Sequence, residues 1–307
     1  MGLVFCALCP HPPLMVPGVG GDMRDKAGAT KNAFAELSAQ MATTNPERIV
    51  IVSPHAPFGN NAYPVFVQSH FHGDMSRFGA PQTVLDFDGD AEFAGRLAES
   101  CKEYGIPVII ADDTFMSERG LPLGIDHGTF VPLYMLKEAC PKARLVIISP
   151  SEREADDHVL LGKAIRKACA DDVRTAFIAS GDLSHKLLAS GPYGFDEMGP
   201  VFDKQIVEAL EHCSLEEVRA IPGSVVRRAG QCGYLPIMVL MGCLGAGASA
   251  HKFSYEGPFG VGYSIMRFEP GAQDAPYSDR EADKDADMPD GADMGNADSE
   301  AAAAGGA

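Results

Sequence analysis

The stretch RIVIVSPHAP, residues 48–57, combines an apolar strand with a stiff histidine turn. Its run of four β-branched residues is typical of a strand buried on both faces. Prolines lie on both sides of His55 and restrict the turn that carries it. A second turn of this kind, CPHPP at residues 9–13, follows the apolar run 3–9 and contains His11. Because loops after neighbouring strands converge at one edge of an α/β sheet, we expect His11 and His55 to meet there.

Strand-like and helical segments alternate along most of the chain. This alternation predicts a mixed, mainly parallel sheet with helices on both faces. The strands are expected at residues 3–9, 48–53, 64–69, 108–111, 144–149, 175–180, 250–255 and 260–268. The helices are expected at about residues 23–41, 91–104, 128–138, 157–170, 199–212 and 231–244.

The composition of the chain restricts its expected binding partners and its expected cellular compartment. The chain has 307 residues and a net charge of −17, which argues against nucleic acid or an anionic membrane as partner. No stretch is long enough to span a bilayer, and the first residues lack the basic region of a signal peptide. Eight cysteines without an export signal therefore predict a cytoplasmic protein with free thiols.

The last segment differs in composition from the rest. Residues 271–307 are rich in Ala, Asp and Gly and contain ten acidic residues against two basic ones. Such a segment cannot bury enough apolar surface to order itself. We expect one domain at residues 1–270 and a disordered acidic tail or linker at residues 271–307.

A metal site needs more ligands than His11 and His55. Glu256, in YEGPFGVGY after an apolar run, is the candidate that we prefer. Two histidines and one carboxylate bind one face of a divalent metal, usually iron(II), and leave the other face for substrate and dioxygen. His251, five residues upstream, is the rival, and a site of three histidines would favour zinc.

Two further histidines occupy similar positions. His127 opens a predicted helix in GIDHGTFVPL, where the positive end of the helix dipole favours a neutral imidazole. His185 follows the strand TAFIAS in the sequence GDLSH. Each is either a structural histidine or, beside a metal, a base or hydrogen-bond donor.

The remaining cysteine and histidine motifs are expected to be structural. Cys6 and Cys9 form a CxxC within a predicted strand, where side chains three positions apart point to opposite faces. We therefore expect ordinary strand cysteines rather than a zinc half-site or redox pair. Four other histidines are expected at the surface: His70, His72, His158 and His212.

With these motifs in view, residues 3–268 resemble the class III extradiol ring-cleavage dioxygenases, the LigB-type catalytic subunit family. The turns at His11 and His55, GIDHGTFVPL and SGDLSH match the family in order and approximate spacing. GPYGFDEMGPVFD together with YEGPFGVGY is similar to the branch associated with AmmeMemoRadiSam systems, which is related to Memo-like proteins.

The resemblance implies a three-layer α/β/α sandwich and an iron(II) enzyme that cleaves a catechol with O2. It implies iron ligation by His11, His55 and Glu256. His185 would deprotonate the catechol, and His127 would orient it. The Memo-like relation implies the alternative of a zinc or iron protein without dioxygenase activity. It also implies a homodimer or association with a second domain or protein.

Overall fold

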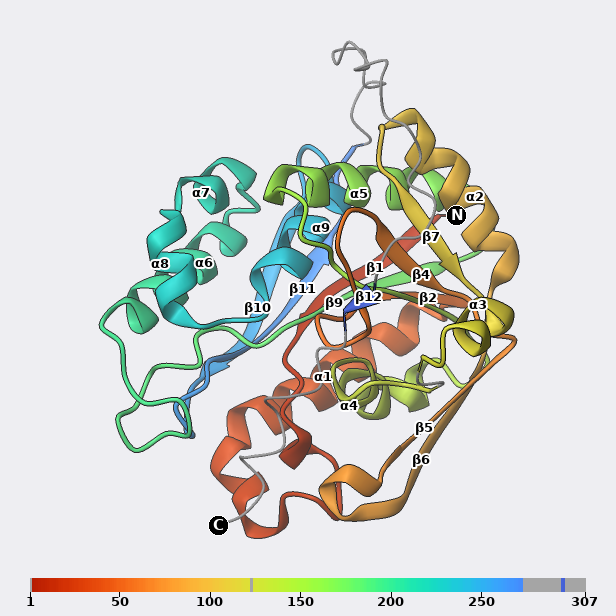
Figure 1. Ribbon diagram of the computed structural model, residues 1–307. Coiled ribbons are helices and arrows are strands. Elements are labelled where there is room, and N and C mark those ends of the chain that lie inside the picture. The colour runs from red at the N-terminus through yellow and green to blue at the C-terminus, as the bar shows by residue number, and fades with distance from the viewer. Residues whose placement is uncertain (1, 122–123, 273–293, 296–307) are drawn as a thin grey trace.

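A mixed eight-stranded sheet forms the centre of the computed structural model, which describes residues 2–121, 124–272 and 294–295 (Figure 1). Its strand order is β10-β11-β1-β9-β2-β8-β4-β7. Four of the seven neighbouring pairs are parallel, among them β1–β9, β9–β2 and β2–β8. These strands are β1 (Leu3–Cys9), β2 (Arg48–Val52), β4 (Tyr63–Phe66), β7 (Val108–Ala111), β8 (Arg144–Ile148), β9 (Thr175–Ser180), β10 (Ser249–Glu256) and β11 (Tyr263–Glu269).

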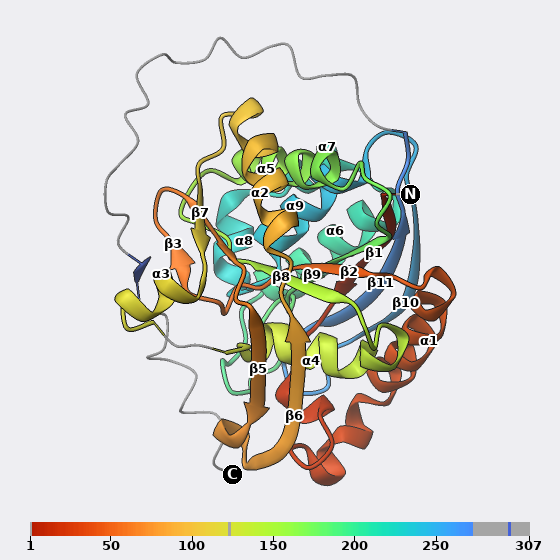
Figure 2. The same cartoon turned by 90° about the vertical axis from the view of Figure 1, so that its right-hand side faces the viewer.

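Helices cover both faces of this sheet, which confirms the predicted fold class. α1 and α4 lie on one face, and α2, α5 and α9 lie on the other (Figure 2). The shorter helices α7 and α8 lie beside α6, and all three pack on the same side as α2, α5 and α9. The helices are α1 (Gly28–Thr44), α2 (Ala91–Glu103), α3 (Asp113–Glu118), α4 (His127–Leu136), α5 (Ala155–Ala168), α6 (Met198–Glu211), α7 (Leu215–Ala220), α8 (Gly223–Ala229) and α9 (Tyr234–Leu244).

The sheet separates two hydrophobic cores. Along β2, Val50 and Val52 pack with α2, α5 and α9, whereas Ile49 and Ile51 pack with α1 and α4. The same alternation divides the CxxC of β1. Cys6 lies in the first core and Cys9 in the second, and both are free thiols. The expectation of ordinary strand cysteines is therefore confirmed.

A two-stranded hairpin outside the main sheet was not expected from the sequence. It consists of β5 (His70–Met75) and β6 (Ala80–Asp88), joined by the short 3-10 helix η3 (Ser76–Phe78). Phe71 and Met75 are buried against α4, while His70 and His72 point outward beside Asp86. The buried residues of the hairpin alternate with exposed and mostly polar ones, so it lacks the continuous apolar run that indicated the other strands. The helices α3, α7 and α8 were also not expected, since they have only six or seven residues each.

The remaining elements of the fold are short 3-10 helices and two-residue strands. The helix expected at residues 23–41 begins as the 3-10 helix η2 (Gly21–Ala27) before α1. Other short elements are η1 (Pro13–Met15), η4 (Lys137–Ala139), β3 (Phe58–Gly59) and β12 (Met294–Gly295), which pairs with β3. The expectation of disorder at residues 271–307 falls on positions outside the described residues, apart from 271–272 and 294–295. Within the described parts of the chain, no helix is long and apolar enough to cross a membrane.

A buried arginine holds the amino-terminal edge of the sheet together. Arg48 opens β2 and is 1% exposed. Its guanidinium donates to Asp90 at 2.7 Å and to Asp171 at 3.0 Å, and it lies 4.4 Å from the ring of Phe93. The Asp90 side chain is fully buried. A buried charge pair of this kind is costly to break, because the partner that remains is left uncompensated.

Replacing Arg48 by Met should lower the free energy of unfolding by about 3–5 kcal/mol, because Asp90 would keep a buried charge with only the more distant Arg144 beside it. Urea titration measures this loss. Arg96→Met is the matched control, since Arg96 pairs with Asp171 nearer the solvent and should cost about 1 kcal/mol or less. Equal losses in the two variants would contradict the assignment.

His158 is not at the surface, contrary to the sequence prediction. It lies in α5 and is fully buried. Its Nε2 accepts a hydrogen bond from the Ser151 N–H, while Nδ1 lies 3.0 Å from the Glu154 carbonyl and 3.2 Å from the Tyr63 hydroxyl. Sequence reasoning missed this because a neutral imidazole with both nitrogens satisfied is no costlier to bury than another polar side chain.

Burial lowers the pKa of His158 to about 4. The folded protein therefore binds fewer protons than the unfolded chain between about pH 6.5 and pH 4, so stability falls as the pH falls through this window. The loss of folding free energy that His158 causes across this window is about 3 kcal/mol. His158→Gln should reduce the dependence of urea midpoint on pH across this window by the share that His158 contributes, whereas the exposed His212→Gln should not. An unchanged slope in His158→Gln would refute a neutral buried imidazole.

Candidate metal centre

Four predicted histidines follow three neighbouring strands or open the helix beside them. His11 follows β1, His55 follows β2, and His185 follows β9, which lies between them in the sheet. His127 is the first residue of α4. Since β1, β9 and β2 are parallel, their carboxyl ends lie at the same edge.

The rings of three of these histidines are in contact. The centroids of His11 and His55 are 4.8 Å apart, those of His55 and His127 are 4.1 Å apart, and those of His11 and His127 are 5.6 Å apart. His185 is close enough for its charge to lower the pKa of His11. The structure therefore brings together His11, His55 and His127, with His185 nearby.

Burial favours the neutral form of His11, His55 and His185. It lowers the pKa of His11 well below its usual value, and the charges of His55, His127 and His185 act in the same direction. The pKa of His55 falls to about 4, and burial is again the largest cause, followed by His127. Burial also lowers the pKa of His185 to about 4. Neutral imidazole is the form that binds metals.

Hydrogen bonds determine which nitrogen of His11 carries the proton. The Ser180 hydroxyl donates its hydrogen to the Gly128 carbonyl. The same oxygen lies 2.9 Å from His11 Nδ1 and can only accept there. The proton of neutral His11 is therefore on Nδ1, and the lone pair of Nε2 is directed toward the centre of the cluster.

A hydrogen-bonded cap at the start of α4 links the two segments that carry His55 and His127. Asp126 caps the helix by accepting from the Thr129 N–H at 3.1 Å, and it also accepts from the Ser53 hydroxyl at 2.6 Å. Gly128 allows this packing, because a Cβ there would lie 2.6 Å from Ser53 Oγ and 3.1 Å from His55 Cδ2. The cap thus connects the turn after β2 to the helix that carries His127.

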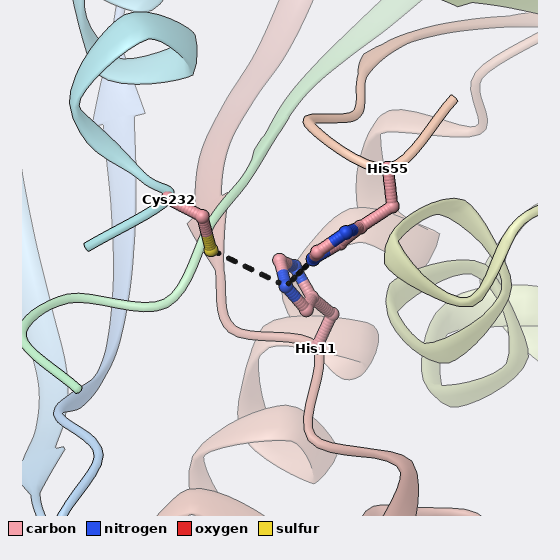
Figure 3. A group of neighbouring side chains, drawn as sticks. All are labelled: His11, His55 and Cys232. Atoms are coloured by element: carbon pink, nitrogen blue, oxygen red, sulfur yellow. Dashed lines mark hydrogen bonds between the residues drawn. The ribbon is translucent and has the colours of Figure 1, made fainter. Parts of the chain in front are cut away.

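Cys232 completes a group of three possible metal ligands, together with His11 and His55. One donor atom from each lies within 4.8 Å of the others. His11 Nε2 is 3.1 Å from His55 Nε2 and 3.5 Å from Cys232 Sγ, and Figure 3 shows His11 between the other two side chains. Two nitrogens that each bind a shared metal at about 2.1 Å have a similar separation. The three side chains therefore fit a metal ion.

Sequence reasoning missed Cys232. It lies in the turn GQCGY immediately before α9, and its only signal is a cysteine between glycine-rich residues at a helix start. The Asp182 N–H donates to its sulfur at 3.3 Å. Burial, followed by the charge of Asp182, raises the pKa of the thiol well above its usual value. A metal that binds there must displace the thiol proton.

Asp182 links the thiol to His11. Its Oδ1 accepts the backbone N–H of His11 at 2.8 Å, and its carbonyl accepts the N–H of Gly233 at 2.9 Å. Burial raises the pKa of this carboxyl to about 7. The turns after β1 and β9 and the start of α9 are thus joined around one buried carboxyl group.

The structure does not bring Glu256 into this group. Its Oε1 accepts hydrogen bonds from both the backbone N–H and the hydroxyl of Thr30, each at 2.6 Å. Thr30 lies in the first turn of α1, where a carboxylate satisfies free N–H groups and complements the helix dipole. The rival, His251, is exposed on β10, with its ring against Phe253.

Cys232→Ala should weaken metal binding more than about 100-fold, because the loss of a direct ligand exceeds the usual cost of losing a supporting residue. Competition with a chromophoric chelator measures this affinity, and elemental analysis gives the stoichiometry. Glu256→Gln is the matched control, since its amide can still accept from Thr30, and it should retain the metal. The reverse pattern would assign the third ligand to Glu256.

Comparisons with known proteins identify the family of this chain. The family model described as the catalytic LigB subunit of aromatic ring-opening dioxygenase matches residues 5–266. Protein CA_C1420 of Clostridium acetobutylicum is 31% identical over 264 residues, which cover 85% of this chain and 56% of that protein. The chain therefore spans little more than half the length of this curated relative.

A solved structure shows the same fold at low sequence identity. The uncharacterized protein JW3007 from Escherichia coli K12 superimposes with a TM-score of 0.57 at 18% identity, covering 86% of this chain and 99% of that one. Its likeness supports the architecture alone. The family match extends over nearly the whole of the main sheet and includes His11, His55, His127 and His185. This chain therefore belongs to the LigB family of aromatic ring-opening dioxygenase catalytic subunits.

Proposed function

We propose that this protein is a metal-dependent dioxygenase that opens the ring of a catechol-type substrate with O2. Iron(II) would be held by His11, His55 and Cys232. The observation that carries the proposal is the convergence of these three donors beside two further histidines, His127 and His185. Membership in the ring-opening dioxygenase family supports the reaction class.

The donor set suits iron, although it differs from two histidines and a carboxylate. Imidazole binds iron, zinc and copper, and thiolate binds the softer members of this group. When bound, the metal would act as the Lewis acid and redox centre of the reaction. The protein supplies the lone pair of His11 Nε2, which is directed inward because Nδ1–H is held by Ser180.

His185 is the base that we assign to the substrate hydroxyl. Its Nε2 is buried and has no hydrogen-bond partner among the residues that the structure describes. A buried nitrogen without a partner is costly, so a hydroxyl that binds beside it gains a full hydrogen bond. Because its pKa is lowered to about 4, the ring is neutral at physiological pH and can accept a proton.

His127 is assigned to orient the substrate. It lies at the amino terminus of α4, where the dipole favours negative charge on a bound group. Its ring contacts those of both His11 and His55. A hydroxyl or developing oxyanion near the metal would therefore lie within reach of His127.

A metal-binding protein without dioxygenase activity is the second candidate. The thiol of Cys232 favours it, because a soft ligand also suits zinc or copper. The engagement of Glu256 with Thr30 favours it as well, since it removes the expected carboxylate from the group. In this case the chain would work as a homodimer or with a further domain, which is consistent with its covering 56% of its longer relative.

Oxygen uptake separates the two candidates. The protein is first loaded with iron(II) under anaerobic conditions. When O2 is then admitted, the protein should consume it with at least one of a panel of catechols and form a yellow ring-opened product. His185→Gln should retain iron and lose about 10²–10⁴-fold in kcat, because the substrate proton then has no acceptor. The exposed His70→Gln serves as control and should keep full activity. Stoichiometric zinc and no oxygen uptake with any catechol would favour the second candidate.

A further inference from the structure

Two aromatic side chains lie against His127 and His185, the two histidines that are not among the three possible metal ligands. Phe78, at the tip of the β5–β6 hairpin, has its ring centroid 5.7 Å from that of His127, at 62°. Tyr193 has its centroid 5.0 Å from that of His185, at 32°. The two rings come from segments more than a hundred residues apart in the chain, and both adjoin the same centre.

Tyr193 is half-exposed although it contacts a buried histidine. Tyr193 is 50% exposed, whereas His185 carries a buried Nε2 that has no hydrogen-bond partner in the described part of the chain. One side of the phenol ring thus lies against His185, and half of the residue is accessible from solvent. An aromatic ring in this position offers a flat apolar surface beside an unsatisfied polar atom, which is the combination that a phenolic ring can fill.

The loop that carries Tyr193 is anchored to the protein. Leu187 pairs with Phe195 across its base, and the Leu187 N–H donates to the Gly260 carbonyl at 3.0 Å. Gly191 packs closely on the chain near Phe259, where a Cβ would lie 2.9 Å from the Phe259 carbonyl oxygen. The loop therefore presents Tyr193 from a fixed backbone, which is what a residue that positions a substrate requires.

Phe78 is fixed in a comparable way. It ends η3, and Gly79, which follows it with φ of 79°, reverses the chain into β6. The hairpin is held by Phe71 and Met75, which are buried against the core that contains α4. Because α4 also carries His127, the hairpin and the histidine share one support.

We propose that Tyr193 and Phe78 are positioning residues that hold the ring of a planar aromatic substrate between His185 and His127. This inference rests on the proposed function, and it assigns the contacts with the substrate ring to two named side chains. Offset or edge-to-face ring contacts would orient the ring, while His185 and the metal site engage its oxygens. Aliphatic diols and small non-aromatic ligands would bind without help from either residue.

Anaerobic titration of the iron(II) protein with 4-nitrocatechol tests this inference, because the ligand changes colour on binding. Tyr193→Ala should weaken binding about 3- to 10-fold, the usual value of one ring contact, whereas Tyr193→Phe should stay within about twofold of the parent. Phe78→Leu, which keeps an apolar side chain for the fold, should also weaken binding. Val84→Ala, on the outer face of β6 and 44% exposed, is the control and should change nothing.

Nitric oxide provides the second measurement, since it binds iron(II) without an aromatic ring. Its affinity should be equal in the parent, Tyr193→Ala and Phe78→Leu. If Tyr193→Ala binds 4-nitrocatechol as the parent does, or loses nitric oxide in the same proportion, the positioning role is overturned while the proposed function stands. If the parent binds nitric oxide but not 4-nitrocatechol, both proposals fail and the metal site remains.

Discussion

The hydrogen bonds that link His11, Ser180 and Gly128 connect the fold to its chemistry. His11 follows β1, Ser180 ends β9, and Gly128 lies in the first turn of α4. Two central strands and one covering helix thus meet at a single serine hydroxyl. The parallel register of β1 and β9 places Ser180 opposite Cys9, next to the turn that carries His11. A shift of one residue would turn Ser180 to the other face of the sheet.

Most of the scaffold could be predicted because its strands are apolar and end in turn residues. β1 and β7 have the predicted bounds, as does β9, and the runs that ended in Ser-Pro lost only their last residue. The β5–β6 hairpin was missed because strands were expected only at continuous apolar runs, whereas its buried residues alternate with exposed and mostly polar ones. Turn histidines were visible because proline, glycine and serine mark the ends of strands, and the structure brings three of them into ring contact.

The grouping of Cys232 with His11 and His55 was beyond the sequence for a physical reason. A carboxylate after a strand looks the same whether it faces a metal or a helix start, and only the three-dimensional position of Thr30 shows that Glu256 accepts hydrogen bonds there. Conversely, Cys232 has no neighbouring ligand in sequence, since the residues around it in the centre come from the other end of the chain. His158 was misplaced at the surface because its partners, Ser151 and Tyr63, are not visible from local pattern. Long-range pairing of polar groups is therefore the part of this protein that a linear reading does not supply.

The strand β2 carries an ion pair network at one end and the candidate metal centre at the other. Arg48 begins it, and His55 lies three residues beyond its end. Five strand residues span about 17 Å, which is beyond the range over which substitutions usually interact. Changes at the two ends should therefore combine independently. In evolutionary terms, the lineage can acquire new ligands or new pocket residues at one edge while stability is restored at the other. This separation gives the scaffold room to diversify its chemistry without redesigning its core.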